Sequence, residues 1–80
     1  MTSMPEPAAL IASLGGRANI RSATPCASRL VVALQDASLA DETALRKLGA
    51  RGVVRLRDSV QILLGPGTDD FAARLARELA

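Results

Sequence analysis

The sequence predicts an α+β fold, a four-stranded antiparallel sheet with three helices packed on one face, in the order α-β-β-α-β-β-α. The chain has 80 residues, enough for one domain with a single core. Although 49% of the residues are apolar, Phe71 is the only aromatic one, so aliphatic side chains must fill the core. Each predicted helix has one apolar stripe, which needs a neighbouring layer to cover it. We expect residues 1–7 to form a flexible tail and residues 8–80 a single domain.

The first part of the chain reads as one helix followed by two strands. Residues 8–14 carry apolar side chains at helical spacing, and a glycine pair follows them. Residues 19–23 form a brief extended run that leads into Pro25, which cannot donate to a strand ladder. Residues 29–34 contain two adjacent valines and favour a second strand. Cys26 is therefore expected where a strand gives way to a turn.

The next elements are a helix and a hairpin. Asp41 is suited to cap a helix, and Gly49 stands at the expected stop of that helix. Residues 52–56 and 60–64 are rich in branched apolar side chains and are separated by a short polar loop. These two segments are predicted to pair as antiparallel strands.

A final helix is predicted after the break at residues 65–67, which contain two glycines and a proline. Thr68 or Asp69 is expected to cap this helix with its side chain. The apolar stripe of the helix consists of Phe71, Ala72, Leu75 and Leu79.

Composition excludes several classes of function. Ten basic and eight acidic residues give a net charge of +2, too small a bias to indicate nucleic-acid binding, and aromatic stacking platforms are absent. No apolar run approaches the length of a membrane span, and residues 1–7 lack the features of a signal peptide, so a cytoplasmic location is expected. One cysteine and no histidine exclude an internal disulfide, an ordinary zinc site and a Cys-His catalytic pair.

Cys26 is the candidate nucleophile, because a thiolate is the reactive form of cysteine and is favoured by nearby positive charge. Arg29 would supply that charge if the chain turns between the two residues. In such a turn the backbone amides of Ala27, Ser28 and Leu30 could form an anion-binding nest, to which the Ser28 hydroxyl could add a donor. Taken alone, this short pattern is a weak signal, and a buried structural thiol is the competing interpretation.

Two blocks of sequence make the interpretation specific. The first block is Asn19-Ile20, Cys26, Ser28-Arg29-Leu30, Val32, Leu34 and Asp36, and the second is Lys47 to Val54, Val60-Gln61-Ile62 and Gly65. Together they resemble the IIB domains of the glucose and N-acetylglucosamine family of the bacterial sugar phosphotransferase system, in which a cysteine is phosphorylated. The resemblance extends over residues 8–79.

The resemblance implies a two-step phosphoryl relay. A phosphohistidine of the IIA component would phosphorylate Cys26, which would then phosphorylate a sugar held by the membrane-embedded IIC component. Arg29 would stabilise the thiolate and the phosphoryl group, and Gln61 would lie near the site. The resemblance implies no metal, nucleotide or other cofactor, a monomeric isolated domain, and association with the inner membrane through IIC. Alignment and charge stabilisation are the main requirements of phosphoryl transfer, so these groups suffice chemically.

The chain shows three departures from the family pattern. Ser28 stands where threonine is usual, Val31 where a second arginine is usual, and Thr24-Pro25 where Asp-Ala is common. Val31 removes a positive charge from the strand face that carries Arg29. It therefore motivates an alternative, a regulatory module of the same fold that no longer transfers phosphate.

Two further interpretations concern other chemistry and other surfaces. Cys26 beside an arginine could serve as a redox-sensing thiol, although the chain has no second cysteine to resolve an oxidised form. Arg51, Arg55 and Arg57 could form a basic patch for an acidic IIA surface, or an ordinary solvated strand edge that discourages aggregation.

Overall fold

The computed structural model describes residues 4–80 of the chain. Its four strands form one antiparallel sheet in the spatial order β1-β2-β4-β3, which confirms the predicted fold class and element order. Two short 3-10 helices accompany the predicted elements. In chain order the elements are α1 (Pro7–Ser13), η1 (Arg17–Asn19), β1 (Ile20–Cys26), β2 (Arg29–Leu34), η2 (Ala37–Leu39), α2 (Glu42–Lys47), β3 (Gly52–Arg55), β4 (Ser59–Leu63) and α3 (Thr68–Leu79).

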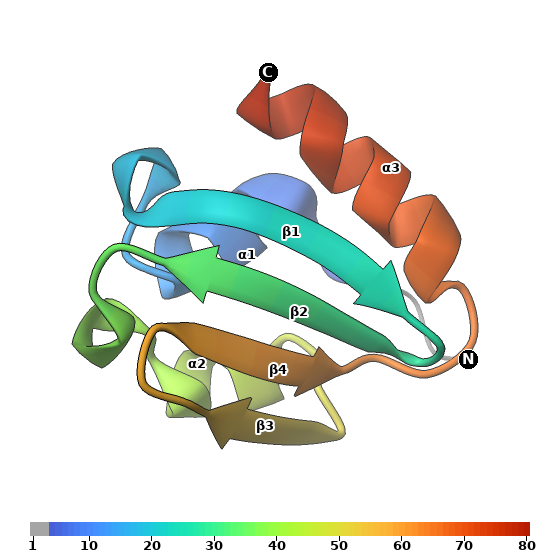
Figure 1. Cartoon of the computed structure of the whole chain (residues 1–80). Coiled ribbons are helices and arrows are strands. Elements are labelled where there is room, and N and C mark those ends of the chain that lie inside the picture. Colours follow the sequence, from blue (N-terminus) through green and yellow to red (C-terminus); the bar gives the residue numbers. More distant parts are fainter. Residues whose placement is uncertain (1–3) are drawn as a thin grey trace.

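The helices leave one face of the sheet open (Figure 1). Alternate side chains of β2 and β4 point to the helices and are fully buried, which makes the two middle strands the floor of the core. All three helices contribute to this core, as their apolar stripes require. The central core side chains are Leu30, Val32, Val60 and Ile62 from the sheet, Leu10, Leu45, Phe71 and Leu75 from the helices, and Leu14 at the end of α1.

The ends of α2 follow the sequence prediction. The Asp41 carboxylate accepts a hydrogen bond from the Ala44 amide at 3.0 Å, which caps the first turn. At the other end Gly49 has a φ of 113°, a left-handed conformation that ends the helix at no steric cost.

The start of α3 differs from the prediction that Thr68 or Asp69 caps the helix. Gly67 occupies the cap position in a left-handed conformation, and no side chain accepts a hydrogen bond from the first turn. The Thr68 hydroxyl is buried and donates instead to the carbonyl of Gly65 at 2.6 Å. Two glycines with positive φ make the turn so tight that the helix begins one residue too early for a threonine cap.

Residues 4–7, the second part of the expected tail, have contacts with the rest of the domain. Pro7 is the first residue of α1, a position that suits proline because its missing amide has no partner there. Pro5 is buried, and Met4 packs against the core. Residues 1–3 of the expected tail lie outside the described residues.

A buried asparagine joins the two ends of the β1–β2 hairpin. Asn19 donates to the carbonyls of Leu14 (2.7 Å) and Asp36 (2.9 Å), and its side-chain oxygen accepts from the Asp36 amide (2.9 Å). The Asp36 carboxylate accepts from the Ser38 hydroxyl and amide, and these bonds hold the pKa of Asp36 below its ordinary value. Asn19 and Asp36 both belong to the first family-like block, so part of that block serves the fold.

Candidate functional site

The site begins with the turn between β1 and β2. β1 ends at Cys26 and β2 begins at Arg29, so Ala27 and Ser28 form the whole loop. Ala27 has a φ of 58°, the only positive φ among the described residues other than glycine. A positive φ at the first loop position suits a two-residue hairpin, in which glycine is the usual residue there. The prediction that Cys26 lies where a strand gives way to a turn is confirmed.

This turn brings Cys26 and Arg29 to the same face of the sheet. They are direct cross-strand partners, and partners in an antiparallel pair project to the same side. The neighbouring pair, Pro25 with Leu30, has Leu30 in the core, so Cys26 and Arg29 project to the open face. Both residues are exposed to solvent. An exposed cysteine and an exposed arginine therefore share this face at the turn, in reach of a second molecule.

The loop after β4 anchors this turn, a feature that the sequence did not reveal. The Ser28 carbonyl accepts hydrogen bonds from the amides of both Leu64 and Gly65, each at 3.0 Å. Gly65 is buried and has a φ of 86°, and a Cβ atom there would come within 3.2 Å of the Arg51 guanidinium carbon. The glycine in the second family-like block is the sequence signal for this anchor, although its partner is far away in the chain.

The backbone amides of the turn differ in availability. Within residues 4–80, the amides of Ala27 and Ser28 and the Ser28 hydroxyl make no hydrogen bond. Leu30 lies inside β2 as the cross-strand partner of Ile62. Because Ser28 accepts from Leu64, the alternation of an antiparallel ladder directs the Leu30 amide toward β4. The amides free to receive an anion are thus those of Ala27 and Ser28.

Gln61 lies next to Arg29 on the open face. Nη1 of Arg29 donates to Oε1 of Gln61 at 3.3 Å. The two residues border a shallow hollow of about 190 Å³. Its remaining lining consists of Gly52, Val54 and Leu63.

Val31 occupies the middle of this face. Its cross-strand partners are Thr24 on one side and Gln61 on the other. An arginine at this position, which the resemblance noted in the sequence led us to expect, would lie beside Gln61 and two residues from Arg29 in the same strand. The present chain has an apolar side chain there, so Arg29 is the only cationic residue that β2 contributes to the open face.

Arg55, one of the three arginines considered for a basic patch, contacts the helical layer. Arg55 donates to the carbonyl of Ala40 at 2.7 Å and lies 3.8 Å from the carboxylate of Glu42, so it faces the helical layer.

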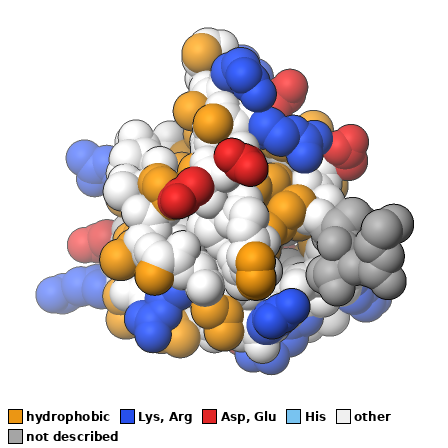
Figure 2. Space-filling view, turned by 90° about the vertical axis from the view of Figure 1, so that its right-hand side faces the viewer, with side chains coloured by type: hydrophobic (Ala, Val, Ile, Leu, Met, Phe, Trp, Pro, Cys, Tyr) orange, Lys and Arg blue, Asp and Glu red, His pale blue; other side chains and the backbone are white. Residues whose placement is uncertain are grey.

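Figure 2 views the molecule from the end that carries the β1–β2 turn. Acidic side chains lie in the middle and upper parts of this view, and basic side chains lie beside them in the upper part. The lower rim, at the level of β3 and β4, carries basic and hydrophobic side chains.

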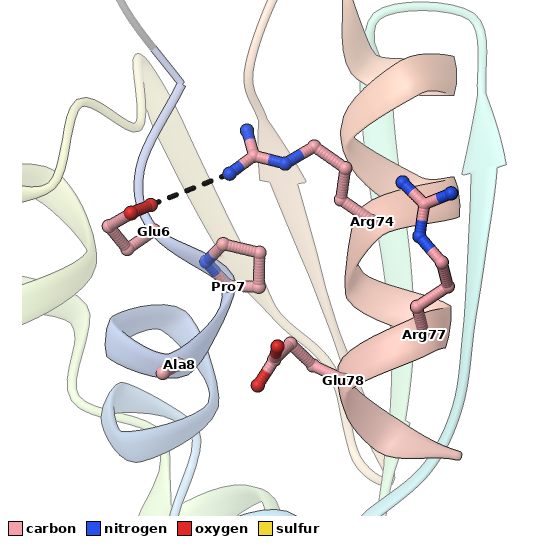
Figure 3. Close-up of a pocket in the computed structure, with 6 residues that line it drawn as sticks. All are labelled: Glu6, Pro7, Ala8, Arg74, Arg77 and Glu78. Atoms are coloured by element: carbon pink, nitrogen blue, oxygen red, sulfur yellow. Dashed lines mark hydrogen bonds and ion pairs between the residues drawn. The ribbon is translucent and has the colours of Figure 1, made fainter.

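A second hollow, of about 280 Å³, lies between the start of α1 and α3 (Figure 3). Arg74 spans it to reach the Glu6 carboxylate at 3.4 Å, an exposed ion pair that contributes little to stability. None of the residues predicted for the site lines this hollow. Its lining residues are Glu6, Pro7, Ala8, Arg74, Arg77 and Glu78.

Comparison with known proteins identifies the class to which this fold and site belong. Residues 8–41 match the family model described as phosphotransferase system, EIIB. The N-acetylglucosamine-specific EIIB component of Streptomyces coelicolor is 36% identical over 66 residues, which cover 82% of this chain and 86% of that protein. The solved structure of one domain of the phosphotransferase system IIabc component from Clostridium difficile matches with a TM-score of 0.76 and 29% identity, covering 90% of this chain and 76% of that one.

This chain belongs to the EIIB family of the sugar phosphotransferase system. The N-acetylmuramic acid-specific EIIBC component of Pasteurella multocida is 44% identical over 69 residues, which cover 85% of this chain. The chain spans only 14% of the length of that fused relative. No helix among residues 4–80 is long and apolar enough to cross a membrane.

Proposed function

We propose that this chain is a phosphoryl carrier that takes a phosphoryl group from a IIA component and delivers it to a sugar bound by a IIC component. The observation that supports this proposal most directly is the pairing of exposed Cys26 with Arg29 across a two-residue turn. The amides of Ala27 and Ser28, which have no hydrogen bond within residues 4–80, lie in the same turn. Thiol, guanidinium and free amides together suit a phosphoryl group on sulfur.

In the first step the sulfur of Cys26, as thiolate, attacks the phosphorus of a phosphohistidine. The S–P bond forms as the N–P bond breaks, and the imidazole of the donor leaves with the bonding electrons. Arg29 balances the charge of the phosphoryl oxygens once the S–P bond has formed. The donor supplies the histidine that this chain lacks.

In the second step a sugar hydroxyl attacks the same phosphorus. An O–P bond forms, the S–P bond breaks, the thiolate of Cys26 is restored, and the hydroxyl proton passes to solvent or to a base of the partner. The names of relatives specific for N-acetylmuramic acid and N-acetylglucosamine support testing N-acetylated hexoses first, with glucose beside them. The step requires a IIC partner at the inner membrane, with this domain on the cytoplasmic side as a monomer.

The test of the first step is a phosphorylation assay with intact-mass detection. The chain is incubated with phosphoenolpyruvate, the general phosphotransferase proteins and a IIA component, and we expect a gain of about 80 Da at Cys26. Cys26→Ala should show no gain, and IIA must carry phosphate in the same reaction. A phosphorylated IIA beside an unmodified Cys26 would overturn the proposal.

The test of the second step separates a carrier from a regulatory module that retains phosphate. Phosphorylated protein is mixed with membranes that contain IIC and the labelled sugar, and sugar phosphate is measured. We expect transfer, and we expect Val31→Arg to increase its rate because a second guanidinium restores charge beside Arg29. Stable phosphocysteine with no sugar phosphate would favour the regulatory alternative that Val31 motivates.

A further inference from the structure

The segment between β4 and α3 joins the candidate site to the core. Figure 1 shows this segment passing beside the tip of the β1–β2 hairpin, where the Ser28 carbonyl accepts from the amides of Leu64 and Gly65. Leu64 belongs to the core cluster, and Gly65 is buried as well. The turn that follows Cys26 is therefore attached to a buried part of the chain.

Thr68 holds the other end of this segment. It is the first residue of α3 and is only 2% exposed, and its hydroxyl donates to the carbonyl of Gly65 at 2.6 Å. Within residues 4–80 no other group donates to that carbonyl. Gly65 is thus bonded on both sides, because its amide binds the turn at Ser28 and its carbonyl binds the helix at Thr68.

The turn needs such support because its backbone is strained. Ala27 has a φ of 58°, a conformation that is costly for a residue with a side chain and persists only where the surroundings hold it. The two hydrogen bonds to the Ser28 carbonyl fix the residue that comes directly after Ala27. The free amides of Ala27 and Ser28 keep their direction only while the turn keeps this conformation.

We propose that Thr68 is a positioning residue for the phosphoryl site, which fixes Gly65 and, through it, the turn that follows Cys26. The proposal deepens the proposed function and rests on it for the chemistry at the sulfur. Because Thr68 is buried, it contacts neither the phosphoryl group nor a partner. Removal of its hydroxyl would leave the Gly65 carbonyl without a donor, at a place from which water is largely excluded.

Thr68→Val tests the connection, because valine has nearly the shape of threonine but no hydroxyl. Amide hydrogen exchange then reports the bonds to the turn, and we expect the amides of Leu64 and Gly65 to exchange about tenfold faster than in the native chain. The amides of Val32 and Val60, which are opposite each other in the middle of the sheet, report global opening. An equal acceleration of all four amides, or none at Leu64 and Gly65, would overturn the positioning role.

Two further variants isolate the hydroxyl. Thr68→Ser keeps the donor and should exchange at Leu64 and Gly65 within about twofold of the native rates. Thr43→Val makes the same chemical change at an exposed position of α2 and should leave these rates unchanged. Exchange as fast in Thr68→Ser as in Thr68→Val would mean that the hydroxyl bond is not the cause, and the proposal would fail.

The chemical consequence is measured by phosphorylation from a IIA component. Thr68→Val should accept phosphate on Cys26 about tenfold more slowly, because displacement of the turn misaligns the sulfur and the free amides. Thr68→Ser and Thr43→Val should accept it at the native rate. Faster exchange at the turn with an unchanged rate of phosphorylation would refute the role of Thr68 in positioning. A native chain that accepts no phosphate would refute the proposed function instead, and the exchange rates would still decide whether Thr68 holds the turn.

Discussion

The two faces of β2 serve different purposes within one strand. Leu30, Val32 and Leu34 have no exposed surface and belong to the core to which all three helices contribute. The intervening positions carry Arg29, with its bond to Gln61, and Val31, both on the open face. Because successive side chains of a strand point to opposite sides, β2 contributes one set of residues to the core and the other set to the candidate site. Substitutions on the two faces should therefore separate stability from chemistry.

The largest effect is expected from truncating the buried face. Leu30→Ala should lower the free energy of unfolding by about 2–5 kcal/mol, because it removes apolar contacts and leaves a cavity. Arg29→Ala, one residue away, should change it by about 0.5 kcal/mol or less. Urea unfolding of both variants tests the contrast. A loss with Arg29→Ala as large as that with Leu30→Ala would mean that the open face also carries stability.

Asn19 is an exception to the separation of stability from chemistry, because it belongs to the first family-like block but is buried in the interior. Asn19→Ala should lower the free energy of unfolding by about 1–3 kcal/mol, since the Asp36 amide and two carbonyls lose their partner. The rate at which iodoacetamide alkylates Cys26 should not change. Gln35→Ala, at an exposed neighbouring position, is the control and should be nearly neutral by urea unfolding. A changed alkylation rate in Asn19→Ala would extend the chemical site to this residue.

Ala27 sharpens the comparison at the turn. Ala27→Gly should raise the free energy of unfolding by about 0.5–1 kcal/mol, because glycine relieves the cost of a φ of 58°. The same change at Ala33, within β2, should lower it by a similar amount, about 0.5–1 kcal/mol. Paired thermal and urea unfolding curves give the two signs. Destabilisation by Ala27→Gly would mean that the strain is absent.

The smallest effect is expected from the titration of Asp36. Its pKa lies below the ordinary value of 3.8, so its bonds to Ser38 stabilise the fold fully above that pH. This contribution is lost as the pH falls through the lowered pKa of the folded state. The difference in stability between the native chain and Asp36→Asn should be constant near neutral pH and should shrink in this acidic range. A difference that grows on acidification would contradict the assignment.

The sequence by itself determined the elements and the location of the turn. Apolar spacing, Asp41 and Gly49 define α2 locally, and the strand signals on either side of Cys26 leave room for only a tight loop. The family-like blocks identify Cys26, Arg29 and Gln61 as candidate site residues from residue type and spacing. The helix and turn signals depend on residues close together in the chain, and the family-like blocks depend on residue type and spacing. Both kinds of signal can therefore be recognised without the structure.

Only the tertiary structure decided how distant segments complete the site. The register of β2 with β4 brings Gln61 to Arg29, and the loop after β4 anchors the carbonyl of Ser28. Arg55 turns toward Ala40, and the turn at Gly67 replaces the predicted side-chain cap of α3. Each of these contacts depends on which strands pair and in what register, and that is set by burial of the whole apolar face. A pattern within a single segment does not contain that information.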